Sequence, residues 1–174
     1  MKIISIIGPE STGKTMLASA LAKQYACPWI PEYARTYIES LTRPYNYQDV
    51  EFIAQKQVAA QKQAIATFAH EKPYLFLDTD LIITKVWFLH VYQTCPNWLQ
   101  DAIVATQIDA FLLCQADLPW EADPVRENGH LRTFFYDWYQ REIEALDTPF
   151  FIVNGVGAKR IQTAIKAIED WCAK

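Results

Sequence analysis

The residues with the clearest chemical potential lie near the start of the chain, in the segment Gly8-Pro9-Glu10-Ser11-Thr12-Gly13-Lys14-Thr15. This segment matches the pattern G-x-x-x-x-G-K-[S/T] of a phosphate-binding loop at every fixed position. Glycines let such a loop curl tightly with its N–H groups inward, and the helix that follows adds unpaired donors and partial positive charge. The segment therefore predicts a site for a nucleoside triphosphate with magnesium, and the alternative is a glycine-rich turn with a surface lysine.

Two side chains of this loop are expected to act directly in the chemistry. We expect Lys14 to reach the β- and γ-phosphates and the Thr15 hydroxyl to hold Mg²⁺. The residues that we expect to contact the nucleotide in this part of the chain are Gly8, Glu10, Ser11, Thr12, Gly13, Lys14, Thr15 and Met16.

A second group of polar residues follows the short apolar run at 74–77. Asp78 is in the position of the carboxylate that holds Mg²⁺ beside the loop hydroxyl in phosphate-loop proteins. The alternative is that Asp78 and Asp80 only cap the helix that comes next. Thr79 occupies the place where many ATPases of this type carry a glutamate that activates water. This favours phosphoryl transfer to a bound acceptor over hydrolysis.

A kinase also needs a base for the acceptor hydroxyl, and Glu32 is the leading candidate. We expect it to end the second strand, next to the strand of the phosphate loop. The alternative is a carboxylate that only stabilises a helix N-terminus. Glu10, inside the loop, faces either the acceptor or solvent, and the sequence leaves that choice open.

The charged, proline-containing segment 115–132 is typical of a lid. Phosphoryl transfer benefits from cations over the equatorial oxygens, and arginine's planar fork suits them, so Arg126 and Arg132 are candidates. Trp120 is a candidate to touch substrate. A solvated loop of mixed charge is the alternative. Near the C-terminus, Asn154 and Gly155 follow the last strand and either frame the base of the nucleotide or form a helix entry turn.

The elements that must position these residues alternate between short apolar strands and helices. Strands are predicted at 2–7, around 27–31, and at 74–77, 110–114 and 149–153. Helices are predicted in the intervals and after the last strand, with Asp49 as the N-cap of a long helix that begins at Val50. This alternation predicts an α/β fold, a three-layer sandwich with a five-stranded parallel sheet. The suggestive residues all follow strand ends, where such sheets bind ligands.

Composition limits the class of protein. A chain of 174 residues, 51% hydrophobic, is expected to form one domain over residues 1–174. The net charge of −4 argues against nucleic acid or anionic membrane as the main partner. The four cysteines include no C-x-x-C pair, so neither a zinc site nor a disulfide framework is expected. The chain shows no signal peptide and no apolar run long enough to span a bilayer. We expect a cytoplasmic protein with a small-molecule substrate, and its oligomeric state stays open.

Taken together, the motifs resemble the ribosylnicotinamide kinase domain of NadR-type proteins and their stand-alone P-loop relatives. The matching pieces are G-P-E-S-T-G-K-T at 8–15, E-Y-A-R at 32–35, L-D-T-D at 77–80, W-E-A-D-P-V-R at 120–126 and V-N-G at 153–155. They occur in the expected order across nearly the whole chain. The resemblance implies a P-loop nucleoside-kinase-like domain that moves the γ-phosphate of ATP to the 5′-hydroxyl of nicotinamide riboside, giving nicotinamide mononucleotide.

The chain departs from the family pattern in two ways. It starts at its first strand, so we expect it to lack the DNA-binding and adenylyltransferase parts of full NadR proteins and neither to repress genes nor to make NAD. Pro31 also stands where the family often has an aromatic residue suited to stacking on the nicotinamide. The stacking partner must then be another side chain, such as Tyr33, Tyr37 or Trp87, or the acceptor differs.

Our hypothesis is an ATP- and Mg²⁺-dependent small-molecule kinase. The predicted catalytic residues are Lys14, Glu32, Asp78 and Arg126, and the predicted magnesium ligands are Thr15 and Asp78. The residues that we expect to contact the acceptor are Glu32, Tyr33, Arg35, Asp80, Trp87 and Trp120. The alternatives are a kinase for another nucleoside or nucleotide, and an ATPase or nucleotide-binding switch that acts on a protein partner. A guanine-specific switch would be expected to carry an N-K-x-D segment, which this sequence lacks.

Overall fold

A five-stranded parallel sheet forms the centre of the computed structural model, which describes residues 1–123 and 126–173. The strand order is β2-β3-β1-β4-β5, and every neighbouring pair is parallel. The strands are β1 (Lys2–Ile7), β2 (Trp29–Ile30), β3 (Tyr74–Asp78), β4 (Ala110–Cys114) and β5 (Phe150–Val153). The predicted α/β fold with five parallel strands is confirmed.

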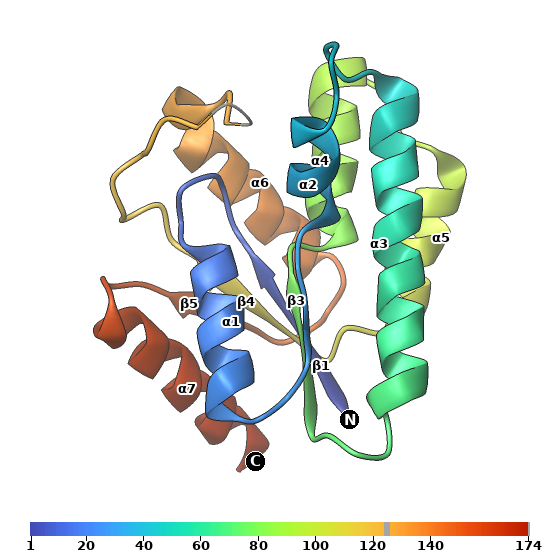
Figure 1. Ribbon diagram of the computed structural model, residues 1–174. Helices are drawn as coiled ribbons and strands as arrows, with labels where there is room; N and C mark the ends of the chain where they lie inside the picture. The colour runs from blue at the N-terminus through green and yellow to red at the C-terminus, as the bar shows by residue number, and fades with distance from the viewer. Residues whose placement is uncertain (124–125, 174) are drawn as a thin grey trace.

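Helices cover both faces of this sheet, so the molecule has three layers (Figure 1). They are α1 (Lys14–Gln24), α2 (Tyr33–Glu39), α3 (Tyr47–Phe68), α4 (Leu81–Tyr92), α5 (Asn97–Ala105), α6 (Arg132–Glu144) and α7 (Ala158–Cys172), with a 3₁₀ turn at Gly129–Leu131. No helix within the described residues is long and apolar enough to cross a membrane.

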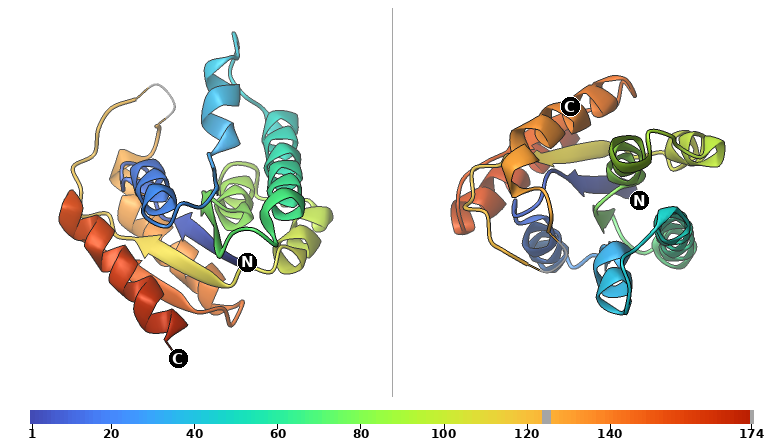
Figure 2. Two further views of the ribbon diagram at one scale, coloured as in Figure 1. Left: turned by 60° about the horizontal axis from the view of Figure 1, so that its bottom comes forward. Right: turned by 90° about the horizontal axis from the view of Figure 1, so that it is seen from above.

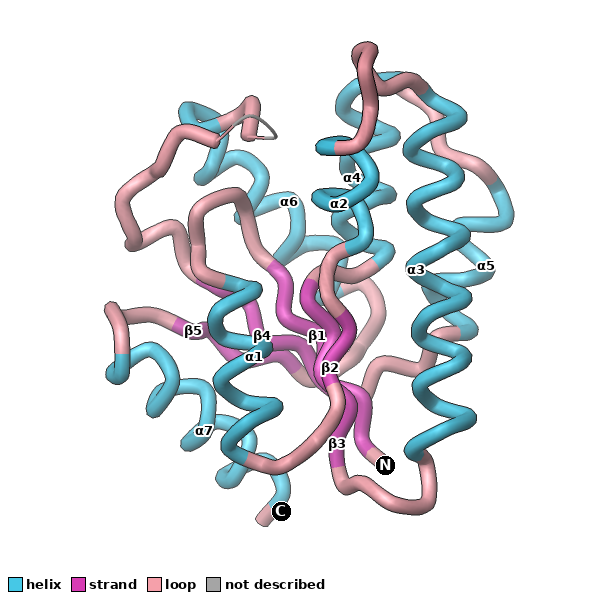
Figure 3. The backbone as a smooth tube through the Cα atoms, viewed as in Figure 1, coloured by secondary structure: helices cyan, strands magenta, loops and turns pink. Residues whose placement is uncertain are grey.

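The side chains of β1 show how the layers are held together. Ile4 and Ile6 pack in the core under α1 and α7, whereas Ile3 and Ile7 join the cores on the opposite face, under α3, α4 and α6. Successive residues of a strand point to opposite faces, so a strand buried on both sides needs a continuous apolar run. The tube in Figure 3 shows this central strand between its neighbours.

The short strand β2 lies at the edge of the sheet against β3, and not beside β1 as the sequence predicted. β3 takes the place next to β1 and pairs with it from Lys2↔Tyr74 to Ile6↔Asp78. A strand between two others must be apolar on both faces and long enough to pair on both edges. β3 meets that demand, whereas β2 has only two residues in the ladder.

The start of α3 also differs from the prediction. The helix begins at Tyr47 with Asn46 as its N-cap, and Asp49 lies in the first turn. Asn46 Oδ1 accepts the Asp49 amide at 3.1 Å, and Asp49 Oδ2 accepts the Asn46 amide at 2.8 Å. This reciprocal pair is a capping box, in which a polar residue three positions inside the helix helps to cap it. Asp49 therefore caps the helix from within.

The carboxyl ends of the strands meet at one end of the molecule. In Figure 1 the loop after β1 and the segment after β4 both lie above the sheet, at the same end as α2. Seen from above in Figure 2, the segment that leaves β4 runs around the loop after β1 before it enters α6. This end carries the residues with chemical potential.

Candidate active site

The phosphate loop between β1 and α1 has a curl that depends on two glycines. Gly13 has φ 74°, in the left-handed region that glycine adopts without steric cost. At Gly8, with φ 151°, an added Cβ would lie 2.7 Å from the carbonyl oxygen of Cys114. The backbone of β4 thus passes too close for any side chain at that position.

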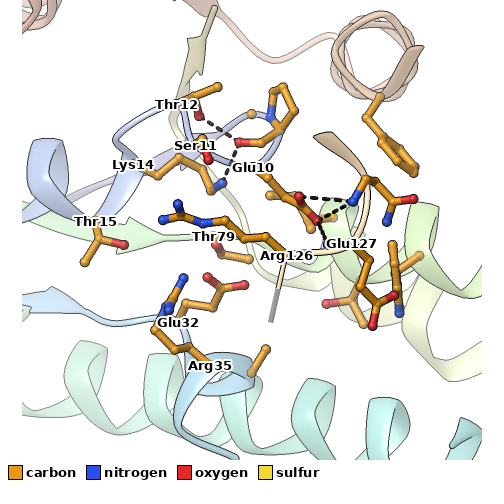
Figure 4. A pocket seen from close by; sticks show the side chains of 18 of the residues that line it. Glu10, Ser11, Thr12, Lys14, Thr15, Glu32, Arg35, Thr79, Arg126 and Glu127 are labelled. Atoms are coloured by element: carbon orange, nitrogen blue, oxygen red, sulfur yellow. Dashed lines mark hydrogen bonds between the residues drawn. The ribbon is translucent and has the colours of Figure 1, made fainter. Parts of the chain in front are cut away.

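Hydrogen bonds inside the loop hold its side chains in place. Thr12 Oγ1 donates to the Pro9 carbonyl at 2.8 Å, and Lys14 Nζ donates to the same oxygen at 3.0 Å. Figure 4 shows both bonds. The ammonium group of Lys14 therefore lies inside the curl, where a bound phosphate would contact it.

A cavity of about 350 Å³ opens in front of the loop. One side, the phosphate wall, consists of the consecutive residues 8–16. The opposite side, which we call the acceptor wall, consists of side chains from five separate segments. These are Glu32, Ala34, Arg35 and Ile38 around α2; Tyr45, Val50, Ile53 and Gln57 around α3; Thr79, Ile83, Thr84 and Trp87 around α4; Arg126, Glu127 and Asn128 in the lid; and Phe135 and Tyr139 on α6.

Asp78 ends β3 and is fully buried. Burial raises the pKa of its carboxyl, and the Thr15 hydroxyl and Lys14 oppose that rise. Within the described part of the chain, neither Asp78 oxygen has a hydrogen-bond partner at full geometry. A buried carboxylate needs a compensating partner. A carboxylate and a hydroxyl are oxygen donors that suit Mg²⁺ together with phosphate oxygens, so the pair Asp78 and Thr15 fits this ion.

Glu32 precedes α2 and lines the cavity. Burial raises the pKa of its carboxyl; Lys14 and Arg35 oppose the rise, and Asp78 and Glu10 add to it. The Glu32 side chain makes no capping hydrogen bond to α2. Glu32 is nevertheless the N-cap residue of α2, so its carboxylate lies at the helix N-terminus, as the alternative expected, and also lines the cavity. Its role as the base stays a prediction.

Cationic side chains from three segments reach the same cavity. They are Lys14 of the loop, Arg35 of α2 and Arg126 of the lid. In Figure 4 the Arg126 guanidinium extends toward Lys14. Arg35 Nη1 donates to Asp123 of the lid at 2.9 Å, which joins α2 to the lid. Positive groups gathered in this way suit the charge of a transferring phosphoryl group.

Glu10 holds the lid over the phosphate loop. Its Oε1 accepts the backbone amides of Glu127 at 3.0 Å and Asn128 at 3.3 Å, and its Oε2 accepts the Trp120 indole N–H at 3.4 Å. The bonds to the lid amides are visible in Figure 4. The sequence left open whether Glu10 faces the acceptor or solvent, and the structure directs its carboxylate to the lid.

The neighbouring residue Ser11 makes a second connection to the lid. Its Oγ accepts the Glu121 amide at 3.2 Å, and its carbonyl accepts Arg132 Nη2 at 3.3 Å. Arg132 thus contacts the loop without lining the cavity, unlike Arg126. Residues 124–125, which belong to the predicted lid and to the matched motif at 120–126, lie outside the described residues.

Several predicted acceptor contacts lie outside the cavity lining, whereas Glu32, Arg35 and Trp87 are part of it. Asp80 is the N-cap of α4 and accepts a backbone amide of the first turn at 2.9 Å. Tyr33 stacks on Tyr37 with ring centroids 6.0 Å apart. Trp120 packs so closely on Gly129 that an added Cβ there would lie 2.6 Å from the indole.

The loop after β5 is tied to the segment after β4 by an ion pair between the buried Arg160 and the solvent-exposed Asp117. Arg160 Nη1 lies 2.6 Å from Asp117 Oδ1 and donates to the Gly155 carbonyl at 2.8 Å. The Gly155 amide donates to Asp117 at 2.7 Å. Asn154 and Gly155 lie outside the cavity lining. Whether they frame the base stays a prediction.

The acceptor wall contains aromatic side chains that no sequence pattern connects. The rings of Tyr45 and Trp87 lie 6.2 Å apart, and those of Trp87 and Phe135 lie 6.3 Å apart. Phe135 and Tyr139 are one helical turn apart on α6 and both line the cavity. The four-residue spacing of Phe135 and Tyr139 was the only feature of the sequence that could have indicated their place in the cavity. The same spacing is equally typical of a helix face buried in the core.

Comparison with known proteins adds to this geometry. The sequence model of one family, described as AAA domain, matches residues 3–160. The trifunctional NAD biosynthesis/regulator proteins NadR of Salmonella typhimurium and Escherichia coli are each 27% identical to the chain over 134 residues, which cover 74% of it. The chain spans about a third of the length of these relatives, 32% of each. The resemblance to NadR-type proteins is confirmed.

Solved structures share the fold. A NadR protein in complex with NR has a TM-score of 0.80 at 22% identity, over 99% of this chain and 52% of that one. A NadR protein with NAD and AMP-PNP has a TM-score of 0.76 at 23% identity, over 98% and 49%. Deoxyadenosine kinase from M. mycoides has a TM-score of 0.64 at 12% identity, over 97% and 99%. The chain therefore has the P-loop fold of nucleoside and nucleotide kinases, as predicted.

Proposed function

The chain belongs to the AAA domain family, and we propose that within this family it is an ATP-dependent kinase whose acceptor is nicotinamide riboside. The observation that carries the proposal is that Lys14 of the phosphate loop and Glu32 line the same cavity. A kinase needs a phosphate site and a base within reach of one acceptor hydroxyl. We propose that Lys14 belongs to the phosphate site and that Glu32 supplies the base.

The residues around the cavity divide the work of phosphoryl transfer. The loop amides and Lys14 bind the β- and γ-phosphates of ATP, and Arg126 places positive charge on the transferred group. The oxygen of the acceptor hydroxyl forms a bond to the γ-phosphorus while the bond between that phosphorus and the leaving ADP breaks. Glu32 accepts the proton that the hydroxyl loses. Thr15 and Asp78 would hold Mg²⁺, which neutralises phosphate charge when bound. The described residues contain no group of three or more metal-binding side chains, so the ion would depend on nucleotide oxygens.

Transfer to an acceptor, and not to water, is favoured by two features. Thr79 follows Asp78 in the place where a water-activating glutamate would stand. The lid is bonded to the loop through Glu10 and Ser11, and a closed lid excludes competing water. These features support a kinase over a hydrolase.

The chemistry of the acceptor wall supports a cationic aromatic ring as part of the acceptor. Tyr45, Trp87 and Phe135 supply aromatic faces, and the Tyr45 hydroxyl donates to the Glu127 carboxylate at 3.2 Å. Aromatic faces beside carboxylates attract a planar cation, and tryptophan does so most strongly. Nicotinamide riboside carries a positively charged pyridinium ring, whereas the common nucleosides are neutral. The NadR structures named for NR and AMP-PNP support the same pairing of acceptor and nucleotide.

The same wall supplies a substitute for the aromatic residue that Pro31 replaces. Trp87 lines the cavity, whereas Tyr33 and Tyr37 pack on each other and on Phe52. We propose that Trp87 stacks on the nicotinamide ring.

The test measures ADP release from ATP and Mg²⁺ with and without nicotinamide riboside and identifies the product by mass. We expect acceptor-dependent ADP matched by nicotinamide mononucleotide, and a loss of at least about a thousandfold in Lys14→Ala, since the lysine contacts the transferred charge. Neutral nucleosides and nucleoside monophosphates serve as competing acceptors.

Each result separates the candidate functions. If ADP release is faster with a neutral nucleoside or a nucleotide than with nicotinamide riboside, the protein is still a kinase but its acceptor is that other molecule. ADP release at one rate with every acceptor would sink the kinase proposal and favour an ATPase or a switch with a protein partner.

A further inference from the structure

Two buried polar atoms on the acceptor wall have no hydrogen-bond partner among the described residues: Thr79 Oγ1 and Gln57 Nε2. Their residues come from different elements, the β3–α4 junction and the middle of α3. The side chains are almost entirely enclosed, with Thr79 6% and Gln57 5% exposed. Buried polar atoms without partners are rare and costly, so each asks for an explanation.

Thr79 also has a backbone conformation that threonine seldom adopts. Its φ is 79°, in the left-handed region, where a β-branched residue is strained. The Thr79 amide donates to the Ile6 carbonyl at 3.1 Å, and Asp80 starts α4 directly after it, so the backbone is held on both sides. Glycine would fit this position without strain. Backbone strain of this kind gathers at functional sites.

Gln57 has a defined orientation. Its Oε1 accepts the backbone amide of Tyr33 at 3.1 Å, the first residue of α2. The other amide atom is therefore the NH₂ group, which can only donate. A partner for Gln57 must present a lone pair, such as a hydroxyl or carbonyl oxygen.

Both atoms lie beside the proposed chemistry. Thr79, Gln57 and Glu32 line the same cavity, and Figure 4 draws Thr79 between the side chains of Lys14 and Glu32. A ligand that fills the acceptor side would meet the two unpartnered atoms and supply what they lack.

We propose that Thr79 and Gln57 hydrogen-bond the acceptor and determine its specificity, Gln57 by donating to an acceptor oxygen and Thr79 by holding the acceptor near Glu32. The proposal rests on the kinase function proposed above. It identifies the acceptor class as a molecule that presents oxygen atoms as well as an aromatic ring, as a riboside does. An acceptor without such oxygens would leave two buried groups unpaired, which enzymes reject strongly.

The chain offers a matched control for Gln57. Gln61 lies one turn further along the same helix, is 2% exposed and also has an Nε2 without a partner among the described residues, but it does not line the cavity. Gln57→Met and Gln61→Met both remove a buried NH₂ group, and Gln57→Met also removes the Oε1 that accepts the Tyr33 amide. Loss of that structural bond alone should lower the unfolding temperature and change the kinetics for ATP and for the acceptor alike, whereas loss of a contact with the acceptor should change the kinetics for the acceptor alone.

The experiment measures KM and kcat for nicotinamide riboside and for ATP, with thermal unfolding of each variant as a check on folding. We expect Thr79→Val and Gln57→Met to lower kcat/KM for the acceptor roughly five- to tenfold each, the loss of one hydrogen bond, with the KM for ATP unchanged. Thr79→Ser, which keeps the hydroxyl, and Gln61→Met should stay within about twofold of the natural chain.

Thr79→Gly separates strain from hydrogen bonding. It removes the hydroxyl and relaxes the backbone, so we expect the acceptor defect of Thr79→Val together with a higher unfolding temperature than that variant. Acceptor kinetics in Thr79→Val and Gln57→Met equal to those of Gln61→Met would overturn the inference. If the natural chain itself shows no acceptor-dependent ADP release, the proposed function fails first, and the two failures stay distinguishable.

Discussion

The two walls of the cavity are built in opposite ways. The phosphate wall consists of consecutive residues, 8–16, whose shape follows from backbone conformations such as φ 74° at Gly13. The acceptor wall consists of side chains from five segments between Glu32 and Tyr139, brought together by the sheet and its helices. The first wall is a local structure that one motif encodes. The second exists only in the folded protein.

This difference indicates that the phosphate site depends on a few residues of one loop, whereas recognition of the acceptor is shared among many side chains. Removing one group from the phosphate wall, such as the Lys14 ammonium, should abolish transfer whatever the acceptor is. On the acceptor wall only Glu32 and Arg126 should approach that importance, because Glu32 is the proposed base and Arg126 is proposed to place positive charge on the transferred group. The other acceptor-wall residues should each change the affinity for the acceptor by a modest factor. The predictions below test this contrast in order of expected effect.

The largest effect on the acceptor wall is expected for Glu32→Gln. Loss of the base should lower kcat roughly 10²- to 10⁴-fold while the KM for ATP stays unchanged. Burial raises the pKa of Glu32, so the group is protonated at low pH and must lose that proton to act as a base. The rate of the natural chain should therefore rise with pH through a pKa above the usual glutamate value and then level off.

The pH profile of kcat/KM for the acceptor checks this assignment. The rising limb should vanish in Glu32→Gln and persist in Arg35→Lys, which keeps the neighbouring positive charge. An unchanged limb in Glu32→Gln would assign the base to another group.

An intermediate effect is expected for Trp87→Ala. A partly desolvated contact between a cation and an aromatic face is worth about 1–2 kcal/mol, so the KM for nicotinamide riboside should rise about tenfold. The KM for ATP should not change, because Trp87 belongs to the wall opposite the phosphate loop. Steady-state kinetics with both substrates varied measure the two constants.

Trp171→Ala is a suitable control for that variant. Trp171 lies on α7, where it packs against Phe151 and not at the cavity. Equal changes in the two variants would show that Trp87 acts through stability and not through contact with the acceptor ring.

The smallest effect on activity is expected for Asp80→Asn, because Asp80 caps α4, which carries acceptor-wall residues, but does not itself line the cavity. Burial raises the pKa of its carboxyl to about 6. The unfolded chain loses this proton near the usual value, about 3.9, so the native protein loses stability as pH rises from about 4 to about 6. Asparagine keeps the helix cap and does not ionise.

The measurement is the free energy of unfolding between pH 4 and pH 8 in urea. The free energy of unfolding of Asp80→Asn should increase relative to that of the natural chain as pH rises from about 4 to about 6, by up to about 3 kcal/mol at the upper end of this range. Its kcat should stay within about twofold of the natural value. A large loss of kcat at equal stability would return Asp80 to the acceptor-contacting residues that the sequence predicted.

Local structure was predictable where neighbouring residues decide it. The strand at 110–114 was placed correctly because a short continuous apolar run of that length is typical of a buried parallel strand. The N-cap of α3 was misplaced at Asp49, because the sequence 46–49 contains two polar residues able to cap and only their reciprocal bonding shows which one starts the helix. The position of β2 beside β3 was missed because strand order depends on pairing between distant segments.

The sequence alone determined the phosphate loop, its strand and helix, and the α/β class, because each follows from consecutive residues whose backbone freedom and apolar periodicity are local properties. Only the tertiary structure decided that Glu10 bonds the lid, that Asp80 caps α4 outside the cavity, and that Trp87 meets Tyr45 and Phe135. The contacts of Glu10 with the lid and of Trp87 with Tyr45 and Phe135 join residues from 42 to more than 100 positions apart. Side chains that far apart in the chain become neighbours only when the sheet fixes the direction of every helix that carries them.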